Sequence, residues 1–384
     1  MKKVFYFGLF GLVAFEFLNV YFIMPFPGSQ RLESLDFAYF MHLHRWIFRG
    51  CLMALVLLGV RDAFKVQRRW KFLLAVVTTL LLVWFLNFQM AADRVFAQPS
   101  VLTFSGRVGN VVDEDSLALI VEGNGETKAY PIRYIVYHHQ VQDRIGGKPV
   151  LITYCSVCRS GRVFEPLVGG RVETFRLVGM DHFNAMIEDA TTGSWWRQAT
   201  GEAVIGPLKG SQLPGYACKQ MTLRKCFELH PGAVVMQPEE ASKEAYDLKG
   251  KYERGESKGT LTRTDPDSWG DKSWVVGIQI GKLAKAYDWN HLVRERIIHD
   301  QLGDTRILLV LAEDQRSFAA FERAGESGEF SLQGDILNLD GKTYDLDGRN
   351  MEDPAERLRP VNAYQEFWHS WRTFHPGTLR FKEK

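Results

Sequence analysis

The sequence has almost no excess of charge of either sign and lacks a phosphate-binding-loop motif. Its 47 Lys and Arg residues are nearly balanced by 45 Asp and Glu, for a net charge of +2, so composition does not indicate a nucleic-acid-binding protein. The glycines of GNGET, residues 123–127, precede no helix, so they predict a hairpin turn and not a phosphate-binding loop.

Long apolar runs are absent from most of the chain and are confined to its N-terminal region, residues 1–92. Three segments predict membrane spans, at about residues 4–25, 40–60 and 72–92. The first has no small-residue cleavage site and is too long for a simple signal peptide, so we expect it to be retained. Glu16 lies within this span, and Arg49 of the second span is its expected partner in a three-helix bundle.

The basic residues near the spans predict the orientation of the chain. Lys2, Lys3 and the basic loop 61–71 indicate a cytoplasmic N-terminus and a cytoplasmic second loop. The third span then leads outward, to a C-terminal domain in the periplasm of a Gram-negative cell. The predicted protein is a multi-pass inner-membrane protein, with the lipid bilayer and a periplasmic or membrane protein as its partners and no nucleic acid.

Short apolar or alternating runs separated by glycine-containing turns dominate the sequence from residue 101 onward, and they predict β-strands. The predicted fold class is α+β and β-rich, with three N-terminal transmembrane helices followed by two tandem related β-rich lobes. The lobes are expected at residues 101–236 and 259–384. The charged segment between them, residues 237–258, is expected to be a linker.

An internal repeat relates the two predicted lobes. Residues 128–165 align with residues 285–322 without a gap at an offset of 157, and eleven positions are identical. The alignment predicts that the second lobe is a degenerate copy of the first. Ala312 and Gln315 stand where the first copy has Cys155 and Cys158, so these cysteines are not required to build the lobe.

The stretch ITYCSVCRSGRVFEP, residues 152–166, contains the pair Cys155-x-x-Cys158, which three kinds of chemistry would explain. A thioredoxin-like redox pair normally opens a helix that lowers the pKa of one thiol, whereas this pair lies between two predicted strands. A metal clamp needs further ligands, and there is no second Cys-x-x-Cys. A structural disulfide would close a very small ring and contribute little. Cys218 and Cys226 form either a disulfide of their own or two ordinary buried thiols.

Met180 and His182, just after the next predicted strand, are the candidate additional metal ligands. Thiolate, thioether and imidazole ligands together favour copper, in particular Cu(I), with zinc second. The metal prediction therefore comprises Cys155, Cys158, Met180 and His182. The alternative for the last two is a buried methionine and a turn histidine.

The stretch DATTGSWWRQATGE, residues 189–202, is the second region of interest. Asp189 and the following Thr-Gly-Ser are typical of a turn, which Asp caps and Gly completes. A structural turn with packed aromatic residues is the simpler interpretation. The functional one is a binding cleft, with Trp196 and Gln198 as cofactor-binding residues and with Asp189 or Glu202 as acid–base groups beside the catalytic candidates Cys155 and Cys158.

These two stretches resemble the motifs of a bacterial family catalogued as domain of unknown function 3179. The family pattern is Tyr-Cys-x-x-Cys-x-Ser followed by Asp-x-x-Thr-Gly-Ser-x-Trp-x-Gln-x-x-Gly-Glu-Ala. Its positions here are Tyr154, Cys155, Cys158, Ser160, Asp189, Thr192, Gly193, Ser194, Trp196, Gln198, Gly201, Glu202 and Ala203. The resemblance implies a shared fold but no established activity, and the three-helix anchor is an addition to the usual soluble or lipid-anchored layout.

The sequence thus predicts an exported, membrane-anchored protein that binds a copper-type metal at the Cys-x-x-Cys turn for redox or metal handling. A thiol–disulfide oxidoreductase and a non-catalytic binding or assembly module with a structural disulfide are the alternatives. Whether the protein is an enzyme is left open.

Overall fold

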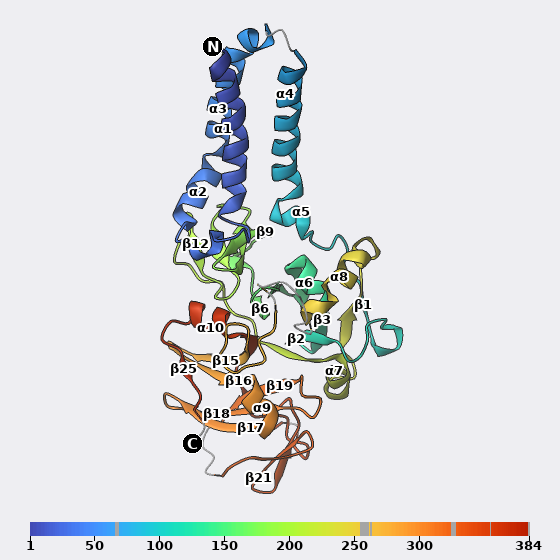
Figure 1. The fold of residues 1–384 in the computed structure, drawn as a ribbon. Helices are drawn as coiled ribbons and strands as arrows, with labels where there is room; N and C mark the ends of the chain where they lie inside the picture. The colour runs from blue at the N-terminus through green and yellow to red at the C-terminus, as the bar shows by residue number, and fades with distance from the viewer. Residues whose placement is uncertain (66–68, 254–260, 262, 324–327, 354, 383–384) are drawn as a thin grey trace. The chain divides into compact units, whose positions relative to one another are not determined.

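The computed structural model describes residues 1–65, 69–253, 261, 263–323, 328–353 and 355–382 (Figure 1). Residues 66–68 of the predicted cytoplasmic loop and 254–258 of the predicted linker lie outside this range. The chain divides into two compact units. Unit 1 comprises residues 1–97, 174–197 and 202–212, and unit 2 comprises residues 98–173, 198–201 and 213–384. This division differs from the sequence-based one, because two segments of the predicted first lobe join the N-terminal helices.

The N-terminal part of unit 1 is helical. Its elements are α1 (Lys2–Tyr21), a 3₁₀ turn (Ser29–Arg31), α2 (Leu35–Leu43), α3 (Arg45–Phe64), α4 (Arg69–Trp84), a π-helix (Phe85–Gln89) and α5 (Ala92–Val95). Helices α1 and α3 lie side by side, and α4 stands farther from them (Figure 1). Glycines permit the close approach of α1 and α3. A Cβ atom at Gly59, for example, would lie 2.5 Å from the backbone nitrogen of Phe5.

Two helices among the described residues are long and apolar enough to cross a membrane, Lys2–Tyr21 and Arg69–Gln89. The second predicted span, residues 40–60, is not among them, which corrects the prediction of three spans. Its helix, α3, carries Arg45, Arg49, Arg61 and Asp62. An N-terminal apolar helix is also typical of a signal sequence, so these two helices support membrane association only weakly.

The predicted partnership of Glu16 and Arg49 is confirmed. Arg49 Nε and Nη2 donate to the two carboxylate oxygens of Glu16 at 2.7 and 2.9 Å. Arg49 also donates to Asn87 Oδ1 of the π-helix. The carboxylate is buried, and a buried charge is tolerated only when it is paired in this way. Three helical segments are therefore joined by one polar contact within an otherwise apolar bundle.

Unit 1 also contains an antiparallel sheet in the order β12-β11-β10-β9. Its strands are β9 (Phe175–Asp181), β10 (Asn184–Asp189), β11 (Trp195–Arg197) and β12 (Ala203–Ile205). Val178, Met186 and Trp195 of the sheet form a buried cluster with Ala38 of α2. The Met180 N–H donates to the Ile23 carbonyl at 2.8 Å, just beyond the end of α1. The sheet and the ends of these helices therefore share one core.

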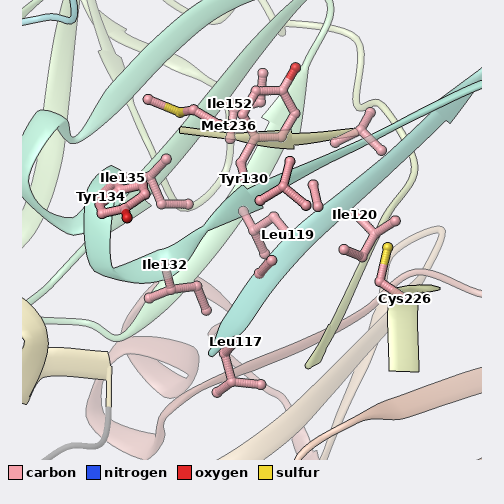
Figure 2. Close-up of a cluster of buried hydrophobic side chains, with 14 of the residues drawn as sticks. Leu117, Leu119, Ile120, Tyr130, Ile132, Tyr134, Ile135, Ile152, Cys226 and Met236 are labelled. Atoms are coloured by element: carbon pink, nitrogen blue, oxygen red, sulfur yellow. The ribbon is translucent and has the colours of Figure 1, made fainter. Parts of the chain in front are cut away.

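The first half of unit 2 forms a five-stranded sheet in the order β1-β14-β3-β2-β13 and a three-stranded sheet, β4-β5-β6. Ile120, Tyr130, Ile135 and Ile152 are among the side chains of the core that these sheets share with α6 (Figure 2). The elements are β1 (Phe104–Ser105), a 3₁₀ turn (Arg107–Gly109), β2 (Leu117–Gly123), β3 (Glu126–Pro131), α6 (Ile132–His138), β4 (Gln140–Ile145), β5 (Lys148–Cys155), β6 (Ser160–Phe164), β7 (Leu167–Val168), β8 (Arg171–Val172), β13 (Cys218–Thr222), α7 (Leu223–Leu229) and β14 (Val234–Met236).

The second half of unit 2 has sheets in the orders β24-β15-β16-β25, β17-β18-β19-β23 and β20-β21-β22. Its core is again apolar and lies between the strands and α9. The elements are β15 (Trp274–Ile280), β16 (Leu283–Asp288), α9 (Trp289–Glu295), β17 (Ile297–Leu302), β18 (Thr305–Leu311), β19 (Phe318–Glu322), β20 (Ser331–Gln333), β21 (Ile336–Leu339), β22 (Lys342–Tyr344), β23 (Arg359–Pro360), β24 (Ala363–Phe367), α10 (Trp368–Phe374) and β25 (Leu379–Arg380).

The strand pairings of the two halves correspond at the sequence offset of 157. Tyr154 pairs with Gly161 in the hairpin β5–β6. In the hairpin β18–β19, Leu311 pairs with Phe318, which lies 157 residues later on both strands. The pairs β4–β5 and β17–β18 keep the same offset, as do β2–β3 and β15–β16. A shift of one residue in the register would move every side chain of a strand to the opposite face of its sheet. Because the registers correspond, the two halves bury equivalent faces of their strands.

The described part of the predicted linker is folded. It forms a 3₁₀ turn (Glu240–Ser242) and α8 (Lys243–Glu253). Tyr246 of α8 is buried in the core of the first half, and its hydroxyl lies 2.6 Å from His138 Nε2 of α6. The Glu253 carboxylate accepts a hydrogen bond from the Leu117 N–H at 2.6 Å. This segment is thus a structural part of unit 2 and not a free tether.

Candidate functional site

The cysteine pair lies on the turn between β5 and β6. Cys155 ends β5 opposite Ser160, and Cys158 lies within the turn. Both residues are buried and are thiols in this structure, without the disulfide that was one of the three alternatives. The backbone of Arg159 completes the turn with a φ of 55°. The equivalent turn of β18–β19 instead places Gln315 at positive φ, so the cysteine turn has a conformation of its own.

Lys272 and His369, from the second half of unit 2, lie over this turn. Lys272 Nζ donates to the Val157 carbonyl at 3.1 Å and also to the Leu261 carbonyl. It lies 3.0 Å from His369 Nε2. An ammonium only donates, so this ring nitrogen accepts while Lys272 is protonated; toward the Val157 carbonyl, 3.3 Å away, it could only donate. The turn is therefore covered by an amine and a neutral imidazole.

Burial lowers the pKa values of both Lys272 and His369. Burial lowers the pKa of Lys272 to about 8, against the opposing influence of Cys158 and Cys155. Burial, together with the charge of Lys272, lowers the pKa of His369 to about 3. At neutral pH the imidazole is uncharged, whereas the amine is mostly protonated and lies close to its titration point. The site thus combines two thiols with one labile cation.

Arg159 is fully buried behind the same turn but is bonded to other groups. Its guanidinium lies 3.9 Å from the ring centroid of Trp274. Nη1 donates to Gln365 Oε1 at 2.8 Å, and Nη2 donates to the Glu253 carbonyl at 2.9 Å. These contacts fix the turn to the second half of the unit and to α8.

Gln198, predicted to bind a cofactor, braces the hairpin that carries the cysteines. Its Nε2 donates to Thr153 Oγ1 at 3.2 Å and to the Ser160 carbonyl at 3.1 Å. Its Oε1 accepts from Ser160 Oγ at 3.0 Å. These bonds give Gln198 a positioning role beside Cys155, while cofactor binding stays a prediction.

Asp189 organises the turn between β10 and β11 in unit 1. Its carboxylate accepts from the Thr192 N–H at 2.5 Å, Thr192 Oγ1 at 2.8 Å, the Ser194 N–H at 3.1 Å and Trp196 Nε1 at 2.9 Å. Asp189 and Trp196 are both buried. A carboxylate with four donors has little remaining capacity to act as a base. The contacts agree with the simpler interpretation of this stretch, a structural turn.

Replacement of Asp189 by alanine is therefore expected to lower the free energy of unfolding by about 3 kcal/mol, because the buried donors of Ser194 and Trp196 lose their acceptor. Thr191→Ala, an exposed change in the same turn, is the matched control and should have almost no effect. Denaturant titration of both variants measures the difference. Equal stability of the two variants would contradict the structural role of Asp189.

Met180 and His182 lie at the turn between β9 and β10 in unit 1, whereas the cysteines belong to unit 2. The four-ligand set therefore stays a prediction. His182 Nδ1 lies 2.7 Å from Asp181 Oδ1, and Nε2 lies 3.3 Å from Glu33 Oε1. The hydrogen bond to Asp181 raises the pKa of His182 despite partial burial. Two carboxylate neighbours favour an imidazolium, which has no lone pair to offer a metal.

Glu202 lies at the edge of the unit 1 sheet. It forms an isolated β-bridge with Gln212, and its carbonyl accepts from the Arg197 N–H at 2.9 Å. Its predicted acid–base role is not tested by these backbone contacts and stays a prediction.

A family model for a protein of unknown function, DUF3179, matches residues 98–378. The chain belongs to the DUF3179 family. The matched region covers the cysteine turn, Gln198, Lys272 and His369, so the whole candidate site lies within the family domain. Comparison with curated proteins and with solved structures gave no match.

This DUF3179 protein has a second polar cluster, which the sequence analysis missed. Among the described residues, Glu122, His230 and Asp347 form the one set of three potential ligands within 4.8 Å of one another. Lys219 bonds both carboxylates, and Arg349 and Arg357 lie 3.1 and 3.5 Å from Asp347. Three cations already neutralise the two acids, so the cluster is better suited to ion pairing than to metal binding.

No local sequence motif marks Lys272, His369 or this cluster. The one available signal was His230, in a His-Pro-Gly element that recurs at residue 375 and suggested only repetition. These contacts join residues that lie 97 to 117 positions apart in the sequence.

Proposed function

We propose that the Cys155–Cys158 turn of this DUF3179 protein binds a soft metal ion, best matched by Cu(I), for redox or metal handling. The observation that carries the proposal is the placement of Lys272 against two buried thiols on one turn. Thiolates favour Cu(I) and zinc over the harder common metals. Two thiolates and one Cu(I) ion carry a single net negative charge, which the Lys272 ammonium offsets in a site shielded from water.

Zinc fits the donor set less well. A structural zinc site needs four ligands. The described residues place no set of three His, Cys, Asp or Glu ligands at this turn. Cu(I), unlike zinc, is stable with two thiolate ligands, so two cysteines suffice. His182 and Met180 are not needed for this form of the proposal.

Thiol–disulfide exchange is the second candidate, and the amine of Lys272 is the observation that favours it. An amine with a pKa of about 8 can accept the proton of a neighbouring thiol and leave a nucleophilic thiolate. Burial of both cysteines opposes this candidate, because the disulfide of a partner protein has to reach a sulfur atom. A small metal ion meets a lower steric barrier.

We further propose that the protein resides in the inner membrane, with its N-terminus in the cytoplasm and the DUF3179 domain in the periplasm. The two apolar helices support the membrane association, and the flanking basic residues support the cytoplasmic N-terminus. Because two crossings would return the chain to the cytoplasm, this orientation requires α3 to cross the bilayer as well, with Arg49 paired to Glu16. The corresponding strand registers support an origin of unit 2 by duplication, with the second copy degenerate. In that view the cysteines are an addition to a scaffold, as Ala312 and Gln315 of the second copy suggest.

The decisive experiment titrates the purified, reduced full-length protein with Cu(I) against a competing chelator. We expect one tightly bound ion per chain and loss of that binding in Cys158→Ser. Cys218→Ser, which alters a buried thiol elsewhere in unit 2, is the matched control and should bind like the parent. Retention of copper by Cys158→Ser would refute the site. A metal-free protein whose two thiols cycle reversibly with a disulfide would instead favour the oxidoreductase.

Lys272 provides a second, independent prediction. Replacement by methionine removes the compensating charge and is expected to weaken Cu(I) binding about 10- to 100-fold, as do other changes to residues around metal ligands. Lys272→Arg retains the cation and should preserve most of the affinity. The same chelator competition measures both variants, and equal weakening in both would show that packing and not charge is responsible.

A further inference from the structure

Unit 1 contains an apolar groove along its helices. The groove has a volume of about 630 Å³ and lies between α1, α3 and α4, where Figure 1 shows α4 standing apart from the other two. Along α1 its lining extends from Phe5 to Glu16, roughly 16 Å at the helical rise per residue. Nearly all of its walls are apolar side chains, such as Leu12, Val56 and Val76. It has the dimensions and the polarity to hold an extended hydrocarbon chain.

A polar chamber of about 490 Å³ adjoins one end of this groove. The two cavities share part of their walls, because both are lined by Arg49, Asn87 and Phe88. The chamber is formed by the end of α1, the start of α3, the π-helix, α5 and strands β9 and β10, all within unit 1. Its lining includes four arginines, Arg45, Arg49, Arg94 and Arg176.

The charges of the chamber are unequal. Arg49 is paired with Glu16, and Arg176 is paired with Glu188 at 2.6 Å and with Asp93 at 3.3 Å. Arg45 and Arg94 have no carboxylate within ion-pair distance among the residues that the structure describes. The Arg45 guanidinium donates to the His42 carbonyl at 2.6 Å. Four cations thus face three carboxylates, which leaves the chamber with a net positive charge.

Two further features point to a ligand. Phe85–Gln89 at the end of α4 is a π-helix, an element that is frequent at functional sites, and it directs Asn87 and Phe88 to both cavities. Asn19 lines the chamber, and its buried Oδ1 has no hydrogen-bond partner. A buried acceptor without a partner is uncommon in a folded protein and calls for a donor such as a hydroxyl group.

We propose that unit 1 binds an anionic phospholipid of the surrounding bilayer, with one acyl chain in the groove and the phosphate headgroup in the arginine chamber. The apolar groove matches the chain, and the uncompensated arginines match the phosphate. A headgroup hydroxyl would satisfy Asn19. The proposal rests on the membrane association proposed above and is independent of the metal site, which lies in the other unit.

The test uses native mass spectrometry of the full-length protein released from vesicles of phosphatidylcholine with and without phosphatidylglycerol. We expect retention of phosphatidylglycerol in preference to phosphatidylcholine. Arg45→Gln and Arg94→Gln should each weaken that preference about fivefold, the effect of one basic residue near an anionic lipid surface. Arg61→Gln, an exposed arginine outside both cavities, is the matched control and should retain the parent's preference. Val76→Trp, which fills the groove, should reduce the retention of both lipids.

The outcomes separate this inference from the proposals on which it depends. A protein that fails to float with either kind of vesicle refutes the membrane association itself. Equal retention of both lipids by the inserted protein would refute the phospholipid site. So would an Arg61→Gln variant whose preference for phosphatidylglycerol falls as much as that of Arg45→Gln or Arg94→Gln. Displacement of the bound lipid by inorganic phosphate alone would also refute it, because the acyl chain would then contribute nothing. None of these results bears on Cu(I) binding by Cys158.

Discussion

Replacement of Arg162 by methionine is expected to lower the free energy of unfolding by about 3–5 kcal/mol. Arg162 of β6 pairs with Glu366 of β24, and both side chains are almost completely buried. The guanidinium also lies 3.8 Å from the ring centroid of Tyr364. Removal of the arginine leaves a carboxylate buried without a countercharge, which is among the most destabilising single changes known in protein cores.

The matched controls distinguish loss of the ion pair from loss of packing. Arg171→Met changes an exposed arginine of β8 and should be nearly neutral. The double variant Arg162→Met/Glu366→Met should recover much of the lost stability, because an apolar pair often replaces a buried ion pair without cost. Denaturant titrations of the full-length protein in detergent provide the comparison. A double variant no more stable than the single one would contradict this account.

The second large effect is expected at Asp347. This carboxylate is fully buried, and Lys219, His230 and Arg349 surround it. Although burial alone would raise its pKa, these partners hold the pKa of Asp347 well below its ordinary value of 3.8. Asp347→Asn is expected to cost about 3–5 kcal/mol near neutral pH, since the surrounding cations lose their countercharge.

The pH dependence of Asp347→Asn provides the independent check. A depressed carboxyl pKa stabilises the folded protein above the unfolded value of about 4, and that stabilisation is lost as the pH falls through the folded value. The difference in stability between the parent and Asp347→Asn should therefore shrink below about pH 4. Asp304→Asn, which changes an exposed acid of unit 2 outside the cluster, should leave the acid profile unchanged. A constant difference between parent and variant down to low pH would contradict the assignment.

The sequence predicted those parts of the structure that depend on local pattern. The short apolar run before Cys155, followed by turn residues, predicted the hairpin, because a short continuous apolar run is typical of a fully buried strand. The Asp-Thr-Gly-Ser combination predicted the turn at Asp189, because these residues bond to their own backbone. The pairing of Glu16 with Arg49 followed from the cost of a lone charge among apolar helices.

Features that depend on distant segments were not predictable from the sequence. Lys272 belongs to a loop that precedes β15, and no local property of that loop indicates that its amine lies over the cysteine turn. His230 follows α7 and Asp347 follows β22, and only the folding of these distant segments brings the two side chains together. The second span failed for a different reason. Its clean apolar part is short, and its helix carries Arg45 and Arg49, so it is not among the helices that are apolar enough to cross a membrane.

The shared core of α2 and the strands β9–β12 has a practical consequence. The family match begins at residue 98, and an expression fragment cut there would appear to contain a complete domain. Such a fragment would lack Ala38 and Tyr39, which pack against the sheet. The side chains of Val178, Met186 and Trp195 would then be exposed to solvent as an apolar surface. We expect it to aggregate, whereas fragments that retain residues 1–97 should stay dispersed in detergent. The N-terminal helices thus complete the core of the family domain and are more than a removable membrane anchor.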